Sequence, residues 1–272
     1  MTNIHRAAGA PLLQVDGLGK TYGRGDTAAE ILRDVSLSVG QGELVSVVGP
    51  SGAGKTTLLN ALSGLSAPTA GSITFDGVPV HGPPEGMSMV FQDYSRSLMP
   101  WMSVQANVEL PLRRTVKEGG ERRRLAQTAL EGVGLPAAGD LKPYQLSGGM
   151  QQRVAIARAL VGEPSLLIMD EPFASVDAQT REDLEDLTRN LPRLFHVSIV
   201  LVTHDIDEAV YLSDRIIVLA GRPTTVHDEV VVSLGSERDQ VETKLLERFG
   251  NLRGRVHAGI RGLPWVDHAP QG

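Results

Sequence analysis

Cysteine is absent from the 272-residue chain, which excludes disulfides, thiol catalysis and cysteine-ligated zinc or iron–sulfur sites. Aromatic residues make up only 4% of the sequence, so stacking platforms for nucleobases are not expected. Basic residues are also outnumbered, because 26 Lys and Arg face 32 Asp and Glu for a net charge of −6. Without a broad basic field, we expect no nucleic-acid partner.

Long apolar runs are missing as well. The longest, such as residues 44–49 and 165–169, have the length of strands and fall far short of the roughly 18–20 residues that span a bilayer. The N-terminus carries no apolar core of the kind that a signal peptide needs. The sequence therefore predicts a soluble chain, which can still dock on a membrane protein.

What is present is an alternation of short apolar strands and helical stretches, which is typical of a parallel α/β sheet. The main domain is predicted over residues 12–232, after a flexible lead-in of residues 1–11. Residues 93–161 show little strand pattern and are predicted to form an inserted α-helical subdomain. Residues 233–272 are expected to hold a helix at 240–249 and then a tail. Strands are expected at residues 12–15, 35–39, 44–48, 73–75, 87–91, 166–169, 198–202, 216–219 and, as a last pair, within 222–232.

The first chemical motif follows the strand at residues 44–48. It fits the pattern G-x-x-x-x-G-K-[ST] and precedes a helical stretch, which is the context of a phosphate-binding loop. Glycines let successive backbone N–H groups point at an anion, and the helix N-terminus adds partial positive charge. The lysine supplies a point charge for the β- and γ-phosphates, and the threonine hydroxyl can bind Mg²⁺. The residues are Gly49-Pro50-Ser51-Gly52-Ala53-Gly54-Lys55-Thr56.

The second motif is a pair of carboxylates, Asp170 and Glu171, directly after the apolar run 166–169. Ligands of open α/β sheets bind at the carboxyl ends of the strands, where this pair is expected to lie. Asp170 can hold Mg²⁺, directly or through water, and Glu171 can polarise an attacking water. Beside a phosphate loop, this interpretation is favoured over an ordinary acidic turn.

The third motif is Leu146-Ser147-Gly148-Gly149-Met150-Gln151-Gln152-Arg153, in which two glycines open a helical pattern. Ser147 is a natural N-cap, so this is a second helix N-terminus suited to an anion. Taken alone, the motif indicates no more than a capped helix.

Together and in this order, the three motifs resemble the nucleotide-binding subunit of an ATP-binding cassette transporter, over roughly residues 12–232. The resemblance implies a P-loop NTPase core with a mainly parallel sheet, an N-terminal antiparallel β subdomain and the inserted helical subdomain. It implies ATP and Mg²⁺ as cofactors, with Thr56, Gln92 and Asp170 at the metal and Lys55, Gln92, Glu171 and His204 in catalysis. Further nucleotide contacts are implied for Tyr22, which matches an adenine-stacking aromatic, Thr57, Ser147, Gly148, Gly149, Gln151 and Asp177, which bridges subunits in this family.

In the resembled family, two subunits pack head to tail around two ATP molecules. We therefore expect a second copy of this chain, integral-membrane permease subunits and, indirectly, a substrate-binding protein as partners. The expected location is peripheral, on the cytoplasmic face of the cell membrane. ATP closes the dimer and hydrolysis releases it, which gives alternating access in the membrane partner.

Residues 95–104, with Pro100-Trp101, followed by Ala106-Asn107-Val108, resemble the nitrate, sulfonate and taurine importer group, as does Glu171-Pro172-Phe173. We expect the apolar residues of 98–102 to help dock the membrane partner, although packing inside the helical subdomain is the alternative. A lipid or lipoprotein exporter subunit and a non-transport ATPase of the same superfamily stay open as other functions. The transported solute contacts other subunits, so this chain supports a substrate group only by resemblance.

Overall fold

A central six-stranded sheet organises the molecule, in a computed structural model that describes residues 10–93 and 97–265. The strand order is β10-β9-β3-β8-β7-β6, and every neighbouring pair is parallel except the antiparallel β9–β10. All side chains of β3 and β8 are buried, as expected for strands covered on both faces. The strands are β3 (Leu44–Val48), β6 (Met87–Val90), β7 (Leu166–Asp170), β8 (Ser198–Val202), β9 (Arg215–Ala220) and β10 (Thr225–Val231).

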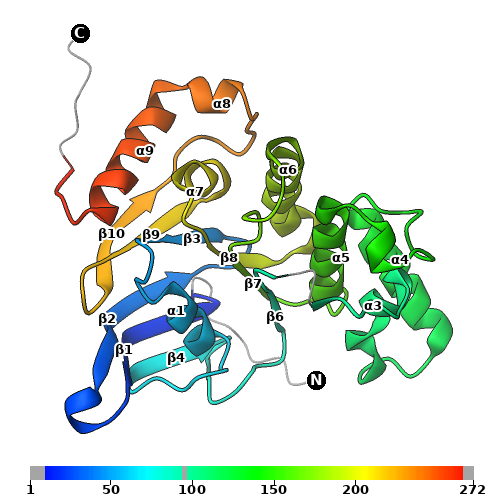
Figure 1. The fold of residues 1–272 in the computed structure, drawn as a ribbon, viewed down its shortest axis with the longest axis horizontal. Coiled ribbons are helices and arrows are strands. Elements are labelled where there is room, and N and C mark those ends of the chain that lie inside the picture. Colours follow the sequence, from blue (N-terminus) through cyan, green and yellow to red (C-terminus); the bar gives the residue numbers. More distant parts are fainter. Residues whose placement is uncertain (1–9, 94–96, 266–272) are drawn as a thin grey trace.

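A second sheet is antiparallel, in the order β2-β1-β4-β5, and lies below the central sheet in Figure 1. Asp76 and Gly77 join β4 to β5 with φ angles of 51° and 75°, the left-handed pair that a tight hairpin turn requires. The predicted fold class, with a parallel core and an N-terminal antiparallel sheet, is therefore confirmed. The strands are β1 (Leu13–Tyr22), β2 (Ala29–Val39), β4 (Ala70–Phe75) and β5 (Val78–Pro79).

Each face of the central sheet has its own apolar core. Helix α1 (Lys55–Leu62) packs between the two sheets, where its leucines meet Val45 and Val47 of β3. Leu44 and Val48 of the same strand point into the other core, because neighbouring side chains of a strand alternate between faces. That core is covered by α5 (Gly148–Leu160), α6 (Ala178–Phe195), α7 (Ile206–Leu212) and α9 (Glu247–Ile260).

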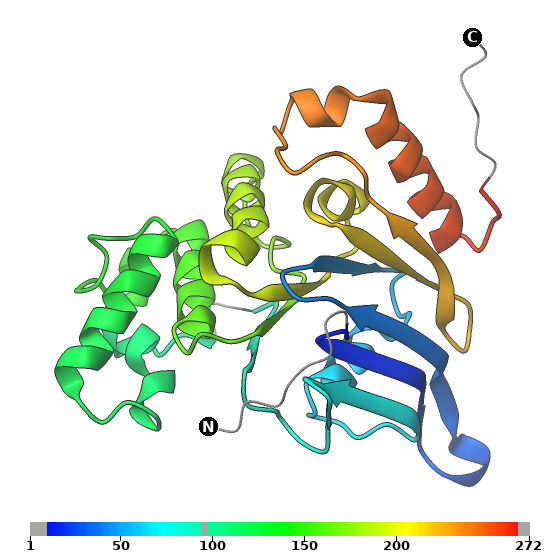
Figure 2. The same cartoon turned by 180° about the vertical axis from the view of Figure 1, so that it is seen from behind.

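Between β6 and β7 the chain forms a helical lobe, which stands beside the central sheet in both Figure 1 and Figure 2. The lobe contains α3 (Val104–Glu109), α4 (Gly119–Gly132) and α5, which pack on one another. None of the helices within residues 10–93 and 97–265 is long and apolar enough to cross a bilayer.

The C-terminal segment differs from the sequence prediction. A short helix, α8 (Glu242–Leu245), precedes α9, which continues to Ile260 where a tail was predicted. Gly250, Gly254 and Gly259 weaken the helical pattern of this stretch. Tertiary packing outweighs their low propensity, because a Cβ on Gly259 would lie only 3.1 Å from Val218 of β9. The glycine thus lets α9 approach the sheet closely.

Candidate functional site

The phosphate-loop motif connects β3 to α1 and lies at the carboxyl end of the central strand. Two of its glycines are required, Gly49 by space and Gly54 by both space and backbone conformation. A Cβ on Gly54, whose φ is 72°, would lie 2.6 Å from Ile31, and one on Gly49 would lie 2.9 Å from the carbonyl oxygen of Leu219. Ser51 and Gly52 form the exposed tip of the loop, and Pro50 accepts the turn hydrogen bond from Ala53.

Lys55 begins α1 and folds back along the loop. Its ammonium donates to the carbonyl oxygens of Gly49 at 2.9 Å and Pro50 at 3.2 Å, and the residue is only 8% exposed. Burial lowers the pKa of Lys55, whereas the carboxylates of Glu171 and Asp170 act in the opposite direction. The loop therefore has a fixed cation at its centre. Thr56 is exposed on the first turn of α1, and Thr57 beside it is half-buried.

Three side chains from successive strand ends meet beside this loop. Glu171 follows β7, and its carboxylate Oε2 lies 3.2 Å from Nδ1 of His204, which follows β8. The same oxygen accepts a 3.2 Å hydrogen bond from Nε2 of Gln92, which follows β6. Because β6, β7 and β8 are adjacent and parallel, their carboxyl ends share one edge of the sheet. The structure thus brings together Gln92, Glu171 and His204.

Glu171 has a left-handed backbone, with φ at 43°, and its N–H donates to the carbonyl of Val202 at 2.8 Å. A non-glycine residue in this region is uncommon and is often held at functional sites by its surroundings. Asp170 ends β7 beside it. Burial raises the pKa of Asp170, and the neighbouring Glu171 charge raises it further.

Oxygen donors at this edge suit a hard divalent cation. The Thr56 hydroxyl, the Asp170 carboxylate and the Gln92 amide are the oxygen ligands that Mg²⁺ prefers. Burial and, after it, the neighbouring Glu171 charge raise the pKa of Asp170, and a bound cation would offset the negative charge of these two carboxylates. The residues present therefore fit a magnesium ion.

The signature motif lies elsewhere, at the start of α5 in the helical lobe (Figure 1). Ser147 caps the helix and accepts a 3.3 Å hydrogen bond from the Met150 N–H. Gly148 and Ser147 are exposed, whereas Gln151 bonds the carbonyl of Leu146 at 3.3 Å. Within one chain, the signature and α1 stand apart in both views (Figures 1 and 2).

Gly149 fixes the position of α5 against the next helix. A Cβ there would lie 2.1 Å from the Thr180 methyl group of α6, so only glycine fits. Thr180 also donates to Asp177, which caps α6 and accepts from the Thr180 N–H at 3.0 Å. These hydrogen bonds lower the pKa of the exposed Asp177 carboxyl. The signature and Asp177 are thus neighbours.

Tyr22 ends β1 with its ring partly exposed, and the Lys20 ammonium lies 5.2 Å from the ring centroid. Its ring is accessible, as stacking on a flat ligand would require. Within the predicted docking segment, Leu98 is 2% exposed and belongs to the core, so the expectation that it helps to dock a partner is wrong and the alternative, packing inside the protein, holds for this residue. Trp101, in contrast, is 72% exposed. Ser95 and Arg96 of the same resemblance lie outside the described residues.

Buried Asn107 helps to explain why Leu98 is buried whereas Trp101 is exposed. Its side chain accepts from the Met99 N–H at 2.8 Å and donates to the Met99 carbonyl at 3.1 Å, which shapes the loop around it. Sequence reasoning missed this role, since nothing in the pattern shows which loop an asparagine will fill.

A second missed group lies next to His204 in the chain. Thr203 and Glu208 are buried and hydrogen-bonded to each other beside the histidine. The spacing Asp205-x-x-Glu208 matches the sequence of a capping box and could have drawn attention to Glu208.

Comparison with known proteins gives consistent results. The family model described as "ABC transporter" matches residues 32–174. The chain is 43% identical over 245 residues to a nitrate import ATP-binding protein of Synechococcus elongatus, covering 89% of this chain and 88% of that protein. It is 40% identical over 261 residues to an aliphatic sulfonates import ATP-binding protein of Burkholderia cenocepacia, covering 93% of each chain.

Among solved structures, the chain is similar to a dimeric ATP-binding cassette in a post-hydrolysis state, bound to ADP and Pi. The TM-score is 0.69 at 34% sequence identity, covering 81% of this chain and 99% of the other.

Proposed function

Because the chain belongs to the ABC transporter family, we propose that it is the ATP-hydrolysing subunit of an importer for a small anion, such as nitrate or an aliphatic sulfonate. The observation that carries the enzymatic part is the convergence of Gln92, Glu171 and His204 beside the phosphate loop. The substrate group is supported by the relatives and by the resemblance of residues 95–104.

In the proposed reaction, the loop Gly49–Thr56 and Thr57 hold the phosphates of ATP, with Lys55 on the β- and γ-phosphates. Thr56, Asp170 and Gln92 would hold Mg²⁺, which would supply positive charge to offset that of the phosphates. Glu171 orients and deprotonates the attacking water, and His204 contacts the γ-phosphate. Tyr22 stacks on the adenine.

The second half of the site comes from another copy of the chain in this proposal. Ser147, Gly148, Gly149 and Gln151 of one copy would face the ATP held by the loop of the other, and Asp177 would lie at the interface. The dimeric state of the similar cassette supports this arrangement. The permease would dock on the helical lobe near Trp101, which is exposed. In this proposal the chain is peripheral and lies on the cytoplasmic face of the membrane.

The alternative functions are an exporter subunit and a non-transport ATPase. Reconstitution in liposomes distinguishes both from an importer subunit. The chain is purified with the membrane protein encoded beside it and placed in liposomes that contain ATP and Mg²⁺, and the expected substrate-binding protein is added outside. We expect ATP-dependent movement of labelled nitrate or taurine in the import direction, and none with a Lys55→Ala variant. ATP hydrolysis without movement of either anion would contradict the proposed substrate group but leave the ATPase intact.

A further inference from the structure

Helix α7 follows His204 directly, and a buried hydrogen bond fixes its first turn. The Thr203 hydroxyl donates to Oε2 of Glu208 at 2.5 Å and accepts from the Asp205 N–H at 3.0 Å. Thr203 is 2% exposed and Glu208 6%. Asp205 in turn caps the helix by accepting from the N–H groups of residues 207 and 208. The backbone on both sides of His204 is therefore held by side-chain hydrogen bonds.

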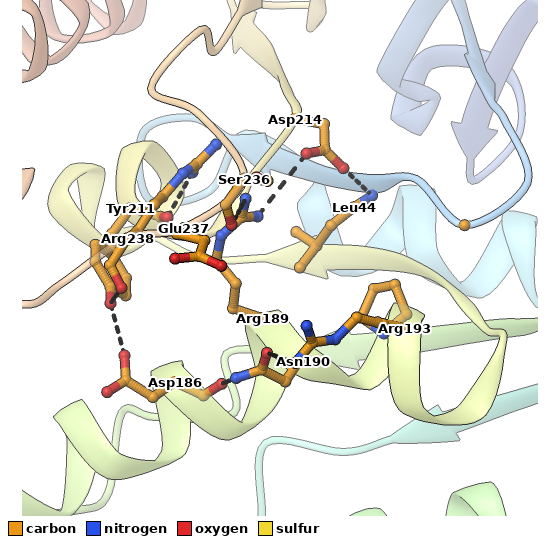
Figure 3. A pocket seen from close by; sticks show the side chains of 12 residues that line it. Leu44, Asp186, Arg189, Asn190, Arg193, Tyr211, Asp214, Ser236, Glu237 and Arg238 are labelled. Carbon is orange, nitrogen blue, oxygen red and sulfur yellow. Dashed lines mark hydrogen bonds and ion pairs between the residues drawn. The ribbon is translucent and has the colours of Figure 1, made fainter.

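The opposite end of α7 is held by two arginines, at a pocket of about 640 Å³ (Figure 3). Arg189 of α6 donates to the carbonyl of Leu212 at 2.7 Å. Arg238, which lies after the last strand, donates to the carbonyls of Tyr211 at 2.5 Å and Val210 at 3.2 Å. The last carbonyls of a helix lack partners within the helix, and cations are favoured there.

Two further residues of the segment 235–244, Gln240 and Lys244, also contact α6 and α7. Lys244 of α8 lies 3.6 Å from the buried carboxylate of Glu185 on α6, and its ammonium is 5.2 Å from the Tyr211 ring centroid. Gln240 donates to Glu185 at 3.1 Å and to Asp186 at 2.9 Å. The Tyr211 hydroxyl also donates to Asp186, at 2.6 Å (Figure 3). This segment therefore clamps α7 onto α6.

We infer that Thr203 and Glu208 position His204 for ATP hydrolysis, and that the segment 235–244 holds α7 in the orientation that this positioning needs. The inference rests on the proposed role of His204. Its physical basis is short range, because Thr203 is covalently joined to His204, whose ring lies 3.2 Å from Glu171. A small shift of a catalytic group has a large effect on rate, so a residue without contact to ATP can control turnover.

The test compares two substitutions of Thr203 in the full chain, by steady-state ATP hydrolysis. Thr203→Val keeps the shape of the side chain but removes the hydroxyl, and we expect kcat to fall roughly ten- to hundredfold. KM for ATP should stay within about twofold, since the phosphate loop is untouched. Thr203→Ser restores the hydroxyl and should restore most of kcat. A Thr203→Val variant with the wild-type kcat would overturn the inference.

The fall in kcat caused by Thr203→Val should disappear in a chain that already lacks the His204 side chain. In a His204→Ala background, adding Thr203→Val should change kcat no further, because the positioned group is gone. A merely structural role would lower kcat in both backgrounds, and that result would overturn the inference. If His204→Ala itself leaves kcat unchanged, the proposed catalytic role of His204 fails, which distinguishes the two failures.

Two further pairs keep the test decisive if Thr203→Val does not fold. Glu208→Gln retains an oxygen acceptor for Thr203, whereas Glu208→Met removes it, so only the methionine variant should lose kcat. Arg238→Met should lower kcat severalfold, whereas Arg248→Met should not. Arg248 lies on α9, where it bonds Ser233. Equal kcat within either pair would contradict the corresponding part of the inference.

Discussion

Two helices of this protein begin beside glycines, and their N-termini differ in the side chains that surround them. At α1 the loop encloses the Lys55 ammonium, with Asp170 and Glu171 close enough to affect its pKa. At α5 the donors are neutral, namely the backbone and the Ser147 hydroxyl. A highly charged triphosphate needs a site with a fixed cation, such as the one at α1. The neutral N-terminus of α5 can only add hydrogen bonds to such a site. Nucleotide binding and dimerisation should therefore respond to different substitutions.

Lys55→Ala is expected to have the largest effect, since it removes the fixed cation from the charged site. ATP hydrolysis should fall by at least about 10²- to 10³-fold, with weaker nucleotide binding measured by fluorescent ATP titration. Lys117→Ala, at an exposed lysine of the helical lobe, is the matched control. Hydrolysis at the wild-type rate would contradict the assignment of the phosphate loop.

Glu171→Gln keeps the size of the side chain but removes the base and one negative charge. Hydrolysis should drop by roughly 10²- to 10⁴-fold while ATP binding persists or strengthens. With ATP and Mg²⁺, the variant should elute as a dimer in size-exclusion chromatography and the wild type mainly as a monomer. Glu163→Gln is a suitable control, because Glu163 is exposed and also has a left-handed φ, of 50°. Full turnover of Glu171→Gln would exclude Glu171 as the base.

Ser147→Arg changes only the neutral N-terminus of α5. In the Glu171→Gln background it should abolish the ATP-dependent dimer, because a bulky cation would fill the second anion site. ATP binding to the monomer should stay within about threefold, since Lys55 lies in a different part of the chain. Ser147→Thr preserves the cap and should preserve the dimer. A dimer that persists with arginine would show that the signature does not face ATP.

Trp101→Glu tests whether the helical lobe docks the membrane subunit. Because Trp101 is exposed, we expect the fold and ATP binding to be unchanged and the yield of co-purified membrane subunit to fall severalfold. Tyr144→Glu, at a second exposed aromatic residue of the lobe, shows whether the effect is local. An unchanged yield with Trp101→Glu would remove Trp101 from the docking surface.

The smallest expected effect concerns Glu208, the buried residue whose carboxylate is hydrogen-bonded to Thr203. Burial raises the pKa of Glu208 to about 7, and its Thr203 hydrogen bond opposes this. The charges of Asp205 and Glu185 also raise it, and Arg181 opposes them. The folded state therefore binds more protons than the unfolded state between pH 4.5 and 7, and the free energy of unfolding falls as pH rises through this range.

Glu208→Gln should remove this dependence. Relative to the wild type, the variant should be more stable at pH 8 than at pH 5.5 by about 1–2 kcal/mol, measured by urea denaturation. Glu163→Gln should show no such difference. A Glu208→Gln variant whose stability follows the wild type at both pH values would contradict the raised pKa.

The sequence predicted the parts of this molecule that depend on local patterns. The phosphate loop and the Asp170-Glu171 pair are continuous in the chain, and Gln92 and His204 were expected near them because of the family resemblance and because each follows a predicted strand. The Arg238 contact with the end of α7 could not be predicted, because it joins segments 27 residues apart through backbone carbonyls that any sequence offers. The burial of Leu98 was missed for a similar reason, since an apolar residue fits a core and a docking surface equally well.

The strand order has a consequence for how the chain is made. The central strand β3 pairs with β8 and β9, which follow it by more than 150 residues. At a synthesis rate of roughly 5–20 residues per second, its partners leave the ribosome about 8–30 s after it does. The antiparallel sheet can close in that interval, because β1, β2 and β4 are near one another in sequence. Until then the backbone N–H and C=O groups along the edges of β3 lack their native strand partners, and unpaired strand edges favour association with other chains. We therefore expect the nascent chain to be most prone to aggregation before β8 and β9 are synthesised.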